Sequence, residues 1–358
     1  MTEKILLISP SIAPSSYGGV QTYVREIYNR IKKKNIEVKV ICIRTKKKLD
    51  DNNIIQINVP NVRFLGIFLF SIIAYRIIKK FFSYYKVYSC ASRAGLSLLF
   101  LKKPFITAIH DVGALIYPGN IFEKFLRRIA YTMVCKKAKK IIVPSLYTKN
   151  GLLEFFPFLK NRIILNYYGI NTDFFKPISK KKKKDKTILY VGRIAENKGI
   201  DTLLQAYKLL KKKEKNIKLV IVGGPTPTTK KSFELIRNKN PDVIFLGEIT
   251  PGDEKLRELY SEASVFVYPS KFSEGFGLPI GEAMSCGTQV VASDLPCFKE
   301  VGGDYTYYFR VGDVDDLKDK IKKALRNPFS AELLRNSIIK RFSWDDNVRK
   351  LLNIINSS

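Results

Sequence analysis

Histidines and clustered cysteines, the residues that usually mark a metal site, are scarce in this sequence. The chain has one histidine, His110, and its five cysteines form no Cys-x-x-Cys pair. Because zinc sites use clustered histidines and cysteines, we expect no metal cofactor. An odd number of cysteines without such spacing is typical of reduced, buried thiols, which indicates a cytoplasmic protein.

Long apolar segments are lacking too. The opening segment Lys4–Pro10 is too short for the apolar core of a signal peptide, and it reads as the first strand of a sheet. The uncharged stretch from Phe64 to Tyr75 falls short of the roughly 20 residues that a spanning helix needs. We therefore expect no helix that crosses a membrane.

Acidic residues are few in the first half of the chain. Up to Lys184 there are 35 Lys and Arg against 9 Asp and Glu, whereas the remainder has 28 against 23. This asymmetry predicts a polyanionic partner for the first half, either nucleic acid or an anionic membrane surface. No zinc finger, RNA-binding sheet motif or basic zipper is present, so we expect a membrane rather than nucleic acid.

The region from Phe64 to Arg93 mixes apolar and basic residues, and we expect it to dock the first domain on the inner face of the cell membrane. A helix packed against a sheet would explain its apolar face equally well. Its basic residues are Arg76, Lys79, Lys80, Lys86 and Arg93, with Phe81, Phe82, Tyr84 and Tyr85 among them. Further basic clusters are Lys32–Lys34, Lys46–Lys48, Lys102–Lys103, Arg127–Arg128 and Lys136–Lys137.

Apolar runs predict strands in two series that begin at Ile5 and Ile188. Near-continuous Ile, Val and Leu runs are typical of parallel strands buried on both faces, with helices between them. The first series is Ile5–Ser9, Val38–Arg44, Ile54–Val59, Phe105–Ile109, Lys140–Val143 and Arg162–Leu165, with helices starting near Gly19, Arg63, Phe122 and Thr148. The second is Ile188–Val191, Leu219–Val222, Val243–Leu246, Ser264–Tyr268 and Gln289–Ala292, with helices from Gly199, Thr229, Asp253 and Pro279.

The fold class predicted is α/β, with two doubly wound, Rossmann-like parallel-sheet domains that face a cleft between the carboxyl ends of their strands. The first domain is expected at residues 1–176 and the second at 187–340. A Lys-rich linker is expected at 177–186, because a proline and five like charges do not pack. Residues 341–358 are expected to form a helix that returns to the first domain.

The most informative segment is Ser273-Glu274-Gly275-Phe276-Gly277-Leu278-Pro279, which continues to Glu282. A glycine-rich loop enters a helix there, so backbone N–H groups and the positive end of the helix dipole suit a phosphate. The carboxylates of Glu274 and Glu282 can accept hydrogen bonds from hydroxyls on either side. A sugar and a ribose flank a diphosphate in nucleotide-sugars, although two glutamates eight positions apart also arise by chance.

This segment resembles the Glu-x₇-Glu signature of the retaining GT-B glycosyltransferases, in particular family 4 (group 1). The resemblance extends through Glu282-Ala283-Met284-Ser285-Cys286-Gly287-Thr288 and is strongest from Ile188 to Gly303. It implies that Glu274 holds sugar hydroxyls, that Glu282 holds the ribose, and that Gly275, Phe276, Gly277 and Leu278 line the donor site.

Three further loops resemble the same family. Arg193 and Lys198 flank a turn between Gly192 and Gly199, resemble its Gly-Arg-x₄-Lys-Gly motif, and would neutralise the leaving diphosphate from the cleft. His110 resembles the histidine that lies over the donor sugar, although a lone histidine is more often structural. The pair Gly18 and Gly19, after Ser15-Ser16-Tyr17, would let the backbone approach the diphosphate or the acceptor.

The function implied is retaining, metal-independent transfer of a hexose, with mannose favoured, from a GDP- or UDP-sugar. The acceptor would be a lipid-linked saccharide or a polysaccharide. The departures from the family, Asn171 in place of an aspartate and no histidine in Tyr88–Ala91, bear on acceptor identity. The alternatives are a nucleotide-sugar epimerase, a non-catalytic sugar-nucleotide-binding relative of the same fold, and a nucleic-acid-binding protein.

Overall fold

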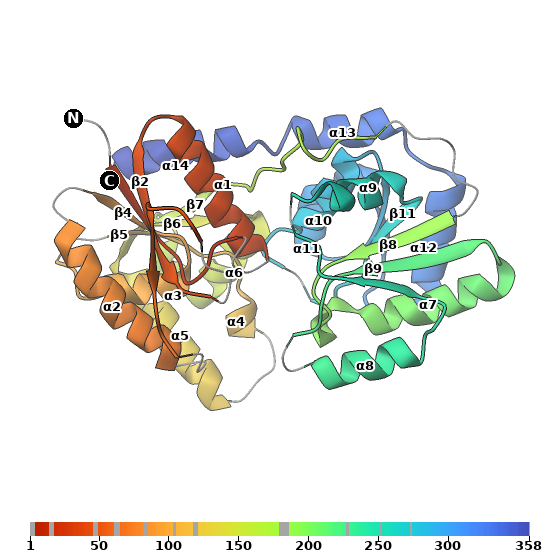
Figure 1. The fold of residues 1–358 in the computed structure, drawn as a ribbon, viewed down its shortest axis with the longest axis horizontal. Helices are drawn as coiled ribbons and strands as arrows, with labels where there is room; N and C mark the ends of the chain where they lie inside the picture. Colours follow the sequence, from red (N-terminus) through yellow and green to blue (C-terminus); the bar gives the residue numbers. More distant parts are fainter. Residues whose placement is uncertain are drawn as a thin grey trace. The chain divides into compact units, whose positions relative to one another are not determined.

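The computed structural model describes residues 4–357 except 14–17, 46–48, 61–64, 82–84, 103–104, 117–120, 179–185, 227–228, 251 and 273. The chain divides into two compact units (Figure 1). Unit 1 consists of Met1–Gly169 and Trp344–Ser358, and unit 2 consists of Ile170–Ser343.

The sheet of unit 1 has seven parallel strands in the order β3-β2-β1-β4-β5-β6-β7. The order reverses between β1 and β4, as it does in doubly wound sheets. The strands are β1 (Lys4–Ile8), β2 (Glu37–Ile43), β3 (Ile54–Ile57), β4 (Lys86–Ser89), β5 (Phe105–Ala108), β6 (Ala138–Val143) and β7 (Ile163–Leu165).

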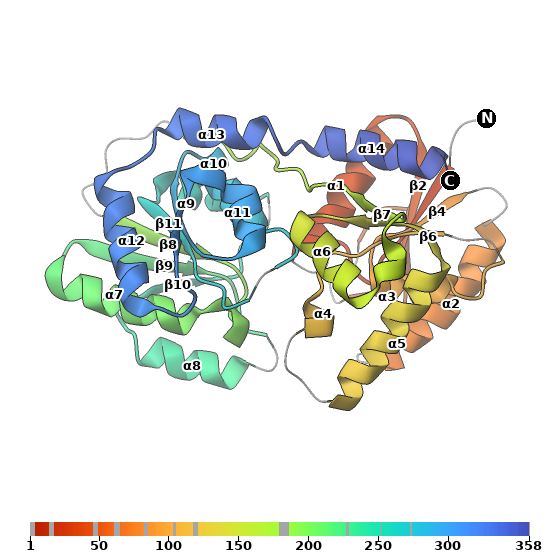
Figure 2. The same cartoon turned by 180° about the vertical axis from the view of Figure 1, so that it is seen from behind.

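Helices cover both faces of this sheet, which explains why β1 is apolar at successive positions. Leu6 and Ile8 pack in a core with Phe70 of α2 and Val134 of α5. Figures 1 and 2 show α1 and α14 on the opposite face. The helices of unit 1 are α1 (Gly19–Lys33), α2 (Leu65–Phe81), α3 (Ser92–Gly95), η1 (Leu96–Leu98), α4 (Gly113–Ile116), α5 (Ile121–Lys137), α6 (Leu146–Phe155), η2 (Pro157–Leu159) and α14 (Trp344–Asn356).

The sheet of unit 2 has six parallel strands in the order β10-β9-β8-β11-β12-β13. They are β8 (Lys186–Val191), β9 (Ile217–Val222), β10 (Ile244–Gly247), β11 (Val265–Tyr268), β12 (Gln289–Ser293) and β13 (Tyr307–Phe309). The order again reverses between the first and fourth strands. Two doubly wound parallel-sheet domains are thereby confirmed.

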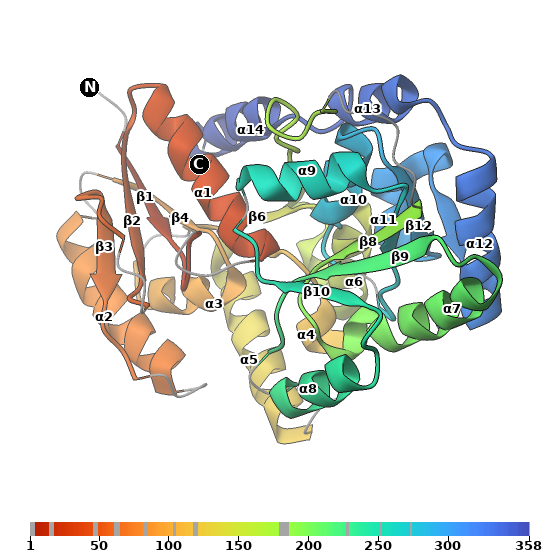
Figure 3. The ribbon, with the colours of Figure 1, turned by 45° about the vertical axis from the view of Figure 1, so that its right-hand side comes forward.

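Helices also sandwich the sheet of unit 2, with α9 and α10 on one face and α7 and α8 on the other (Figure 3). The helices of unit 2 are η3 (Glu196–Lys198), α7 (Ile200–Lys213), α8 (Lys230–Asn238), α9 (Glu254–Glu262), α10 (Leu278–Ser285), α11 (Pro296–Gly302), η4 (Gly303–Tyr305), α12 (Val314–Arg326) and α13 (Ala331–Ile339).

The chain passes between the units at 169/170 and again at 343/344. Residues 170–178 therefore belong with unit 2, ahead of the segment 179–185, which lies outside the described residues. The Ile170 amide donates to the carbonyl of Phe342 at 3.0 Å, and Arg335 of α13 donates to the carbonyls of Thr172 and Phe175. In unit 1, a Cβ at Gly169 would lie 2.1 Å from the Trp344 amide nitrogen, so only glycine fits there.

Helix α2 carries the most apolar stretch of the first half, and its inner face is part of the unit 1 core. None of the helices in the described part of the chain is both long and apolar enough to cross a bilayer.

Candidate active site

The candidate site residues Arg193, Lys198 and Glu274 of unit 2 gather at the point where its strand order reverses. The loop after β8 carries Arg193 and Lys198, and the loop after β11 carries Glu274. Because β8 and β11 are neighbours in the sheet, their carboxyl ends bring both loops to one place. Ligands of doubly wound sheets bind at this position.

Backbone contacts hold the two loops together. Gly199 has a φ of 66°, in the left-handed region that favours glycine, and a Cβ there would lie 1.9 Å from the Pro269 carbonyl oxygen. Next to it, the Lys271 amide donates to the Asn197 carbonyl at 2.9 Å. The position of Lys198 relative to Glu274 is thus fixed by the main chain.

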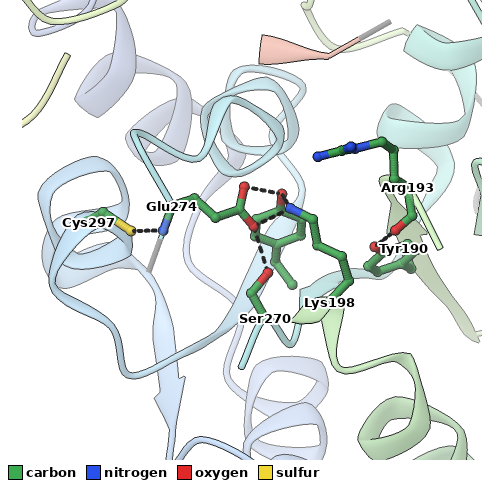
Figure 4. A network of polar contacts seen from close by, with 7 residues as sticks. Tyr190, Arg193, Lys198, Ser270, Glu274 and Cys297 are labelled. Atoms are coloured by element: carbon green, nitrogen blue, oxygen red, sulfur yellow. Dashed lines mark hydrogen bonds and ion pairs between the residues drawn. The ribbon is translucent and has the colours of Figure 1, made fainter. Parts of the chain in front are cut away.

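Glu274 is the centre of a hydrogen-bond network made with Lys198, Ser270 and Tyr268 (Figure 4). Its Oε1 accepts from Lys198 Nζ at 2.5 Å and from Ser270 Oγ at 2.7 Å, and its Oε2 accepts from the Tyr268 hydroxyl at 3.0 Å. The backbone amide of Glu274 donates to Cys297 Sγ at 3.2 Å. Lys198 Nζ also donates to the Tyr268 hydroxyl at 3.3 Å.

This network keeps Glu274 ionised. Burial by itself raises the pKa of Glu274, but the charge of Lys198 and the hydrogen bonds from Lys198, Ser270 and Tyr268 outweigh it and hold the pKa below its ordinary value. Burial, followed by the charge of Glu274, raises the pKa of Tyr268 well above its ordinary value. Tyr268 therefore stays a hydroxyl and Glu274 a carboxylate.

Arg193 and Lys198 differ in their surroundings. Lys198 is buried, with 8% of its side chain exposed, whereas Arg193 is exposed. Figure 4 shows Arg193 joined to the neighbouring residues through its carbonyl, which accepts from the Tyr190 hydroxyl at 2.9 Å. Among the described residues, no carboxylate forms an ion pair with the Arg193 guanidinium. Its charge is therefore available to an anion.

The loop residues after Glu274 lead into the start of α10. Gly277 is the N-cap with a φ of 100°, and no side chain caps the helix there. No acidic residue occupies the first turn, so the N–H groups are not neutralised by the protein. Phe276 is buried and packs edge-on against Phe342, with ring centroids 5.2 Å apart. Gly275 and Leu278 lie on either side of these residues.

Glu282 is the fifth residue of α10, just beyond its first turn. Its Oε2 accepts from the Tyr260 hydroxyl at 2.9 Å. Burial and then the charge of Glu282 raise the pKa of Tyr260 well above its ordinary value. The two glutamates of the signature are therefore held by different partners, Glu274 by the Lys198 network and Glu282 by Tyr260.

His110 follows β5 in unit 1 and is buried, with 9% exposed. Its Nε2 contacts the carbonyl of Cys90, and its Nδ1 contacts the hydroxyl of Tyr168. Burial lowers the pKa of His110 to about 4, although the Cys90 carbonyl and the charge of Asp111 act in the opposite direction. The imidazole is therefore uncharged at neutral pH.

Gly18 and Gly19 stand at the start of α1. Gly18 is its N-cap with a φ of 150°, and a Cβ there would lie 2.6 Å from Gln21 Oε1. The first turn of α1 has no capping side chain and no acidic residue. Ser15, Ser16 and Tyr17 lie outside the described residues.

The sequence missed the partners of the functional side chains, namely Ser270, Tyr268, Cys297, Tyr260 and Tyr168. Ser270 and Tyr268 stand at the carboxyl end of β11, the position from which a doubly wound sheet presents ligand-binding residues. That placement is the signal that could have found them. Nothing in the sequence pairs Tyr168 with His110, which lies 58 positions earlier.

An acidic cluster elsewhere in unit 2 lies at the start of α12. One Asp-x-Asp sequence is present, Asp313-Val314-Asp315, where Asp313 caps α12 by accepting from the Asp316 amide at 2.9 Å. Asp315 pairs with Lys318 at 2.5 Å. Within the described ranges, no group of three or more His, Cys, Asp and Glu side chains could hold a metal ion. Metal independence stays a prediction.

Both halves of the chain match models of glycosyltransferase families. Residues 17–174 match Glycosyltransferase Family 4, and residues 171–342 match Glycosyl transferases group 1. The chain belongs to the group 1 glycosyltransferases, and the protein is a glycosyltransferase.

Two of the relatives are named as O-antigen chain mannosyltransferases. The O-antigen chain mannosyltransferase B of Escherichia coli is 28% identical over 265 residues, which are 69% of each chain. The O-antigen chain mannosyltransferase RfbU of Salmonella typhimurium is 28% identical over 241 residues, 66% of this chain and 65% of the relative. An uncharacterized glycosyltransferase of Methanocaldococcus jannaschii is 28% identical over 353 residues, 95% of this chain and 94% of the relative.

Solved structures show the same GT-B fold. Sucrose-phosphate synthase from Thermosynechococcus elongatus matches with a TM-score of 0.84 and 21% identity, over 99% of this chain and 98% of that one. HepE of Anabaena in complex with UDP-glucose matches with a TM-score of 0.80 and 16% identity, over 99% and 100% of the two chains.

Proposed function

We propose that this glycosyltransferase moves a hexose from a nucleoside-diphosphate sugar to a lipid-linked or polysaccharide acceptor, with retention of configuration and without a metal ion. The observation that carries the proposal is the Glu274 network at the reversal point of the unit 2 sheet, beside the uncapped start of α10. Mannose is favoured because two relatives are named O-antigen chain mannosyltransferases. Both GDP- and UDP-sugars remain candidate donors.

The diphosphate would bind where positive charge is concentrated in unit 2. The N–H groups at the start of α10, the exposed Arg193 and Lys198 are its proposed partners. An ammonium group has three donors, and Lys198 uses two of them on Glu274 and Tyr268. One donor is left for a phosphate oxygen, so Lys198 can bind the donor without releasing Glu274.

The sugar and the ribose would lie on either side of the diphosphate. The ionised Glu274 accepts hydrogen bonds from sugar hydroxyls, and Glu282 accepts them from the ribose. Glu274 is not proposed as a covalent nucleophile, because three protein donors already engage its two oxygens. Its role is to orient the sugar.

Retention follows from attack on the same face that the diphosphate leaves. The acceptor hydroxyl oxygen bonds to the anomeric carbon as the bond from that carbon to the phosphate oxygen breaks. The departing phosphate oxygen takes the proton of the acceptor hydroxyl. Arg193, Lys198 and the α10 N–H groups stabilise the charge that grows on the diphosphate.

Release of nucleoside diphosphate, measured with and without acceptor, tests the proposal. A transferase releases it in proportion to glycosylated product, and the anomeric configuration of the product is read by NMR spectroscopy. An epimerase would change the sugar without releasing nucleoside diphosphate, and a non-catalytic relative would do neither. A thermal-shift screen with GDP, UDP and ADP selects the donor, since ligand at 100 times its Kd stabilises by about 2.7 kcal/mol.

Unit 1 carries an exposed apolar and basic surface, which we define as the α2/α5 surface. Phe68 of α2, Phe100 after η1 and Phe125 of α5 are 62%, 75% and 61% exposed. Both helices pack against η1, so these rings belong to one side of the unit. Soluble monomers rarely expose such apolar patches without a binding role. The other members are the exposed apolar Ile72, Leu126, Ile129 and Met133 and the exposed basic Arg76, Lys79, Lys80, Lys102, Arg128 and Lys136.

The charge of this surface matches an anionic membrane. No acidic residue lies between Asp51 and Asp111, and Glu123 is the one acidic residue in the sequences of α2 and α5. We therefore propose that the protein docks on the inner face of the cell membrane through the α2/α5 surface. Each basic residue near such a surface contributes roughly 1 kcal/mol. This location would also bring the enzyme to a lipid-linked acceptor.

The proposed surface differs from the segment Phe64–Arg93 suggested by the sequence. Phe64, Phe82 and Tyr84 lie outside the described residues, as do Lys46–Lys48 and Lys103. Tyr85 is buried, and its hydroxyl donates to Glu37. The α2/α5 surface instead combines α2 with α5 and Phe100.

A further inference from the structure

The buried imidazole of His110 has a partner on each ring nitrogen. Nε2 lies against the carbonyl oxygen of Cys90, and Nδ1 lies against the hydroxyl of Tyr168. A carbonyl oxygen can only accept, so Nε2 must carry the hydrogen in this arrangement. Neutral imidazole then has an acceptor at Nδ1, and the Tyr168 hydroxyl donates to it.

Aromatic rings enclose the imidazole on the side of Tyr168. Tyr23 of α1 packs edge-on against His110 with centroids 5.0 Å apart and stacks on Tyr168 at 4.9 Å. Tyr168 stacks on Trp344, the first residue of α14, at 5.6 Å. Three residues from separate segments, Cys90, Tyr168 and Tyr23, therefore contact the imidazole and fix its orientation.

The ionisable groups around His110 do not supply a charge that would favour imidazolium strongly. Tyr23, Tyr88, Cys90 and Tyr168 are buried, and burial raises the pKa of each of them above its ordinary value. These groups stay neutral. Asp111 is half-buried and is the nearby carboxylate, but its Oδ1 accepts from the Gly113 amide at 2.9 Å.

We propose that Tyr168 is a positioning residue for the transfer reaction: with the Cys90 carbonyl, its hydroxyl locks His110 as the uncharged, Nε2-protonated tautomer. This proposal rests on the proposed function, with His110 in the role that the family resemblance implies, over the donor sugar. Positive charge develops on the sugar ring during transfer to an oxygen nucleophile, as in glycoside cleavage. An imidazolium beside it would oppose that charge, whereas a neutral ring does not.

A single histidine makes the test direct. In a chain freed of any histidine tag and labelled with ¹⁵N-histidine, long-range ¹H–¹⁵N spectra report one ring. We expect a protonated Nε2, an unprotonated Nδ1 and no titration between pH 5.5 and 8. A Tyr168→Phe variant should raise the titration midpoint by about one pH unit, the worth of one lost hydrogen bond. Its turnover should fall on the order of tenfold with the donor KM little changed.

The matched control is Tyr23→Phe, which removes a hydroxyl from the same cluster. That hydroxyl contacts Tyr88 at 2.6 Å and not the imidazole, so the His110 spectrum should not change. A wild-type ring protonated at Nδ1, or a Tyr168→Phe spectrum that matches wild type at every pH, would overturn the proposal. Because the spectra are recorded without substrate, they can fail independently of the transferase activity.

Discussion

Unit 1 and unit 2 share a strand order but differ in charge and in the use of their surfaces. Unit 1 has 31 Lys and Arg against 10 Asp and Glu, a net charge of +21, whereas unit 2 has 32 against 22, a net charge of +10. In unit 2 the functional side chains form ion pairs and hydrogen bonds at the sheet edge. In unit 1 many of the basic side chains are exposed, beside exposed aromatic rings.

In the proposed function, one topology therefore serves two kinds of ligand. A small anion needs a few fixed donors, which the rigid ends of β8 and β11 provide. An extended surface needs many weak contacts, which exposed helices provide without any fixed geometry. Substitutions in the donor-site residues of unit 2, or in the α2/α5 surface of unit 1, can therefore separate the two proposed roles.

The largest effect is expected from substituting Lys198 and Arg193, the basic residues of the unit 2 site. Lys198→Ala and Arg193→Ala should each lower turnover roughly a hundred- to thousandfold, because each removes charge from the leaving diphosphate. The Lys198→Ala change should also affect folding, because Lys198 is buried. Its loss leaves Glu274 without its cation and should cost on the order of 2–3 kcal/mol of unfolding free energy.

Kinetics and urea unfolding of the same variants measure both effects. Lys271→Ala is the matched control, since it removes a half-buried lysine of the neighbouring loop that pairs with Asp201. Near-normal turnover in either Arg193→Ala or Lys198→Ala would remove that residue from the mechanism. Equal stability of the two variants would contradict the difference in burial.

Glu274→Gln in unit 2 and His110→Ala in unit 1 should lose turnover by comparable factors, because Glu274 holds sugar hydroxyls in the proposed function and the family resemblance implies that His110 lies over the same sugar. Glu274→Gln should also change the pH dependence of stability. The pKa of Glu274 is lowered by folding, so its contribution is present above the unfolded pKa of about 4.3 and is lost as pH falls through the folded value.

Urea unfolding at pH 7 and at pH 4 or below checks this sign. The stability gap between wild type and Glu274→Gln should be widest at neutral pH and should narrow in acid. Glu254→Gln, an exposed change on α9, should show little gap at either pH. A gap that widens in acid would contradict the direction of the Glu274 shift.

A smaller effect is expected at the α2/α5 surface. Phe68→Ser and Phe100→Ser should each weaken cosedimentation with anionic liposomes about tenfold, the worth of one apolar side chain leaving the bilayer interface. High salt should weaken wild-type binding as well. Leu235→Ser, which removes a side chain of α8 that is 61% exposed in unit 2, is the control.

Three outcomes would contradict the proposal that the α2/α5 surface docks on a membrane. One is equal binding to neutral and anionic vesicles, and another is tight RNA binding with no liposome binding. The third is a dimer that Phe100→Ser dissociates, which would make the surface an interface between copies. Turnover on a soluble acceptor should not change in the surface variants.

Removal of metal ions is expected to have no effect on turnover. EDTA should leave turnover unchanged, because the proposed neutralisation of the diphosphate uses Arg193, Lys198 and backbone N–H groups. Turnover before and after chelation, and again with added magnesium or manganese, is the measurement. Loss that a divalent ion restores would show that the cations of unit 2 do not suffice.

Much of the fold was predictable, because most strands are uninterrupted apolar runs between turn residues. Strand β4 was missed as an element because Lys86 begins it and only Val87 and Tyr88 follow before a serine. Strand β13 was missed because three aromatic residues, Tyr307–Phe309, carry no periodic pattern. Helix α12 begins at an acidic cluster, Asp315-Asp316, which the sequence analysis did not interpret as a helix start.

The site was partly predictable. Lys198 and Glu274 stand out because glycines at strand ends mark the loops that carry them. Their direct pairing was not predictable, since it depends on the backbone contact between Gly199 and Pro269, 70 positions apart. The burial of Lys198 follows from the same contact, and a lysine in so basic a sequence gives no sign of it.

The position of α14 has a consequence for the order in which the two units fold during synthesis. Unit 2 is one continuous segment, Ile170–Ser343, whereas unit 1 requires both Met1–Gly169 and Trp344–Ser358. Asn166 donates to the Asn347 carbonyl and Lys350 to that of Leu165, so β7 finds these partners only after residues 344–350 have left the ribosome. Domains usually complete their folding in order of synthesis.

In this protein the order of folding should be reversed. Unit 1, whose synthesis begins first, should complete its folding last. Partial proteolysis of ribosome-bound chains that stop at residue 343, followed by a spacer long enough to fill the exit tunnel, would then find unit 2 resistant and unit 1 still sensitive. Resistance of both units at that length would show that α14 only adds to a completed domain. The exposed apolar surface of an unfinished unit 1 is also the part of the nascent chain most in need of a chaperone.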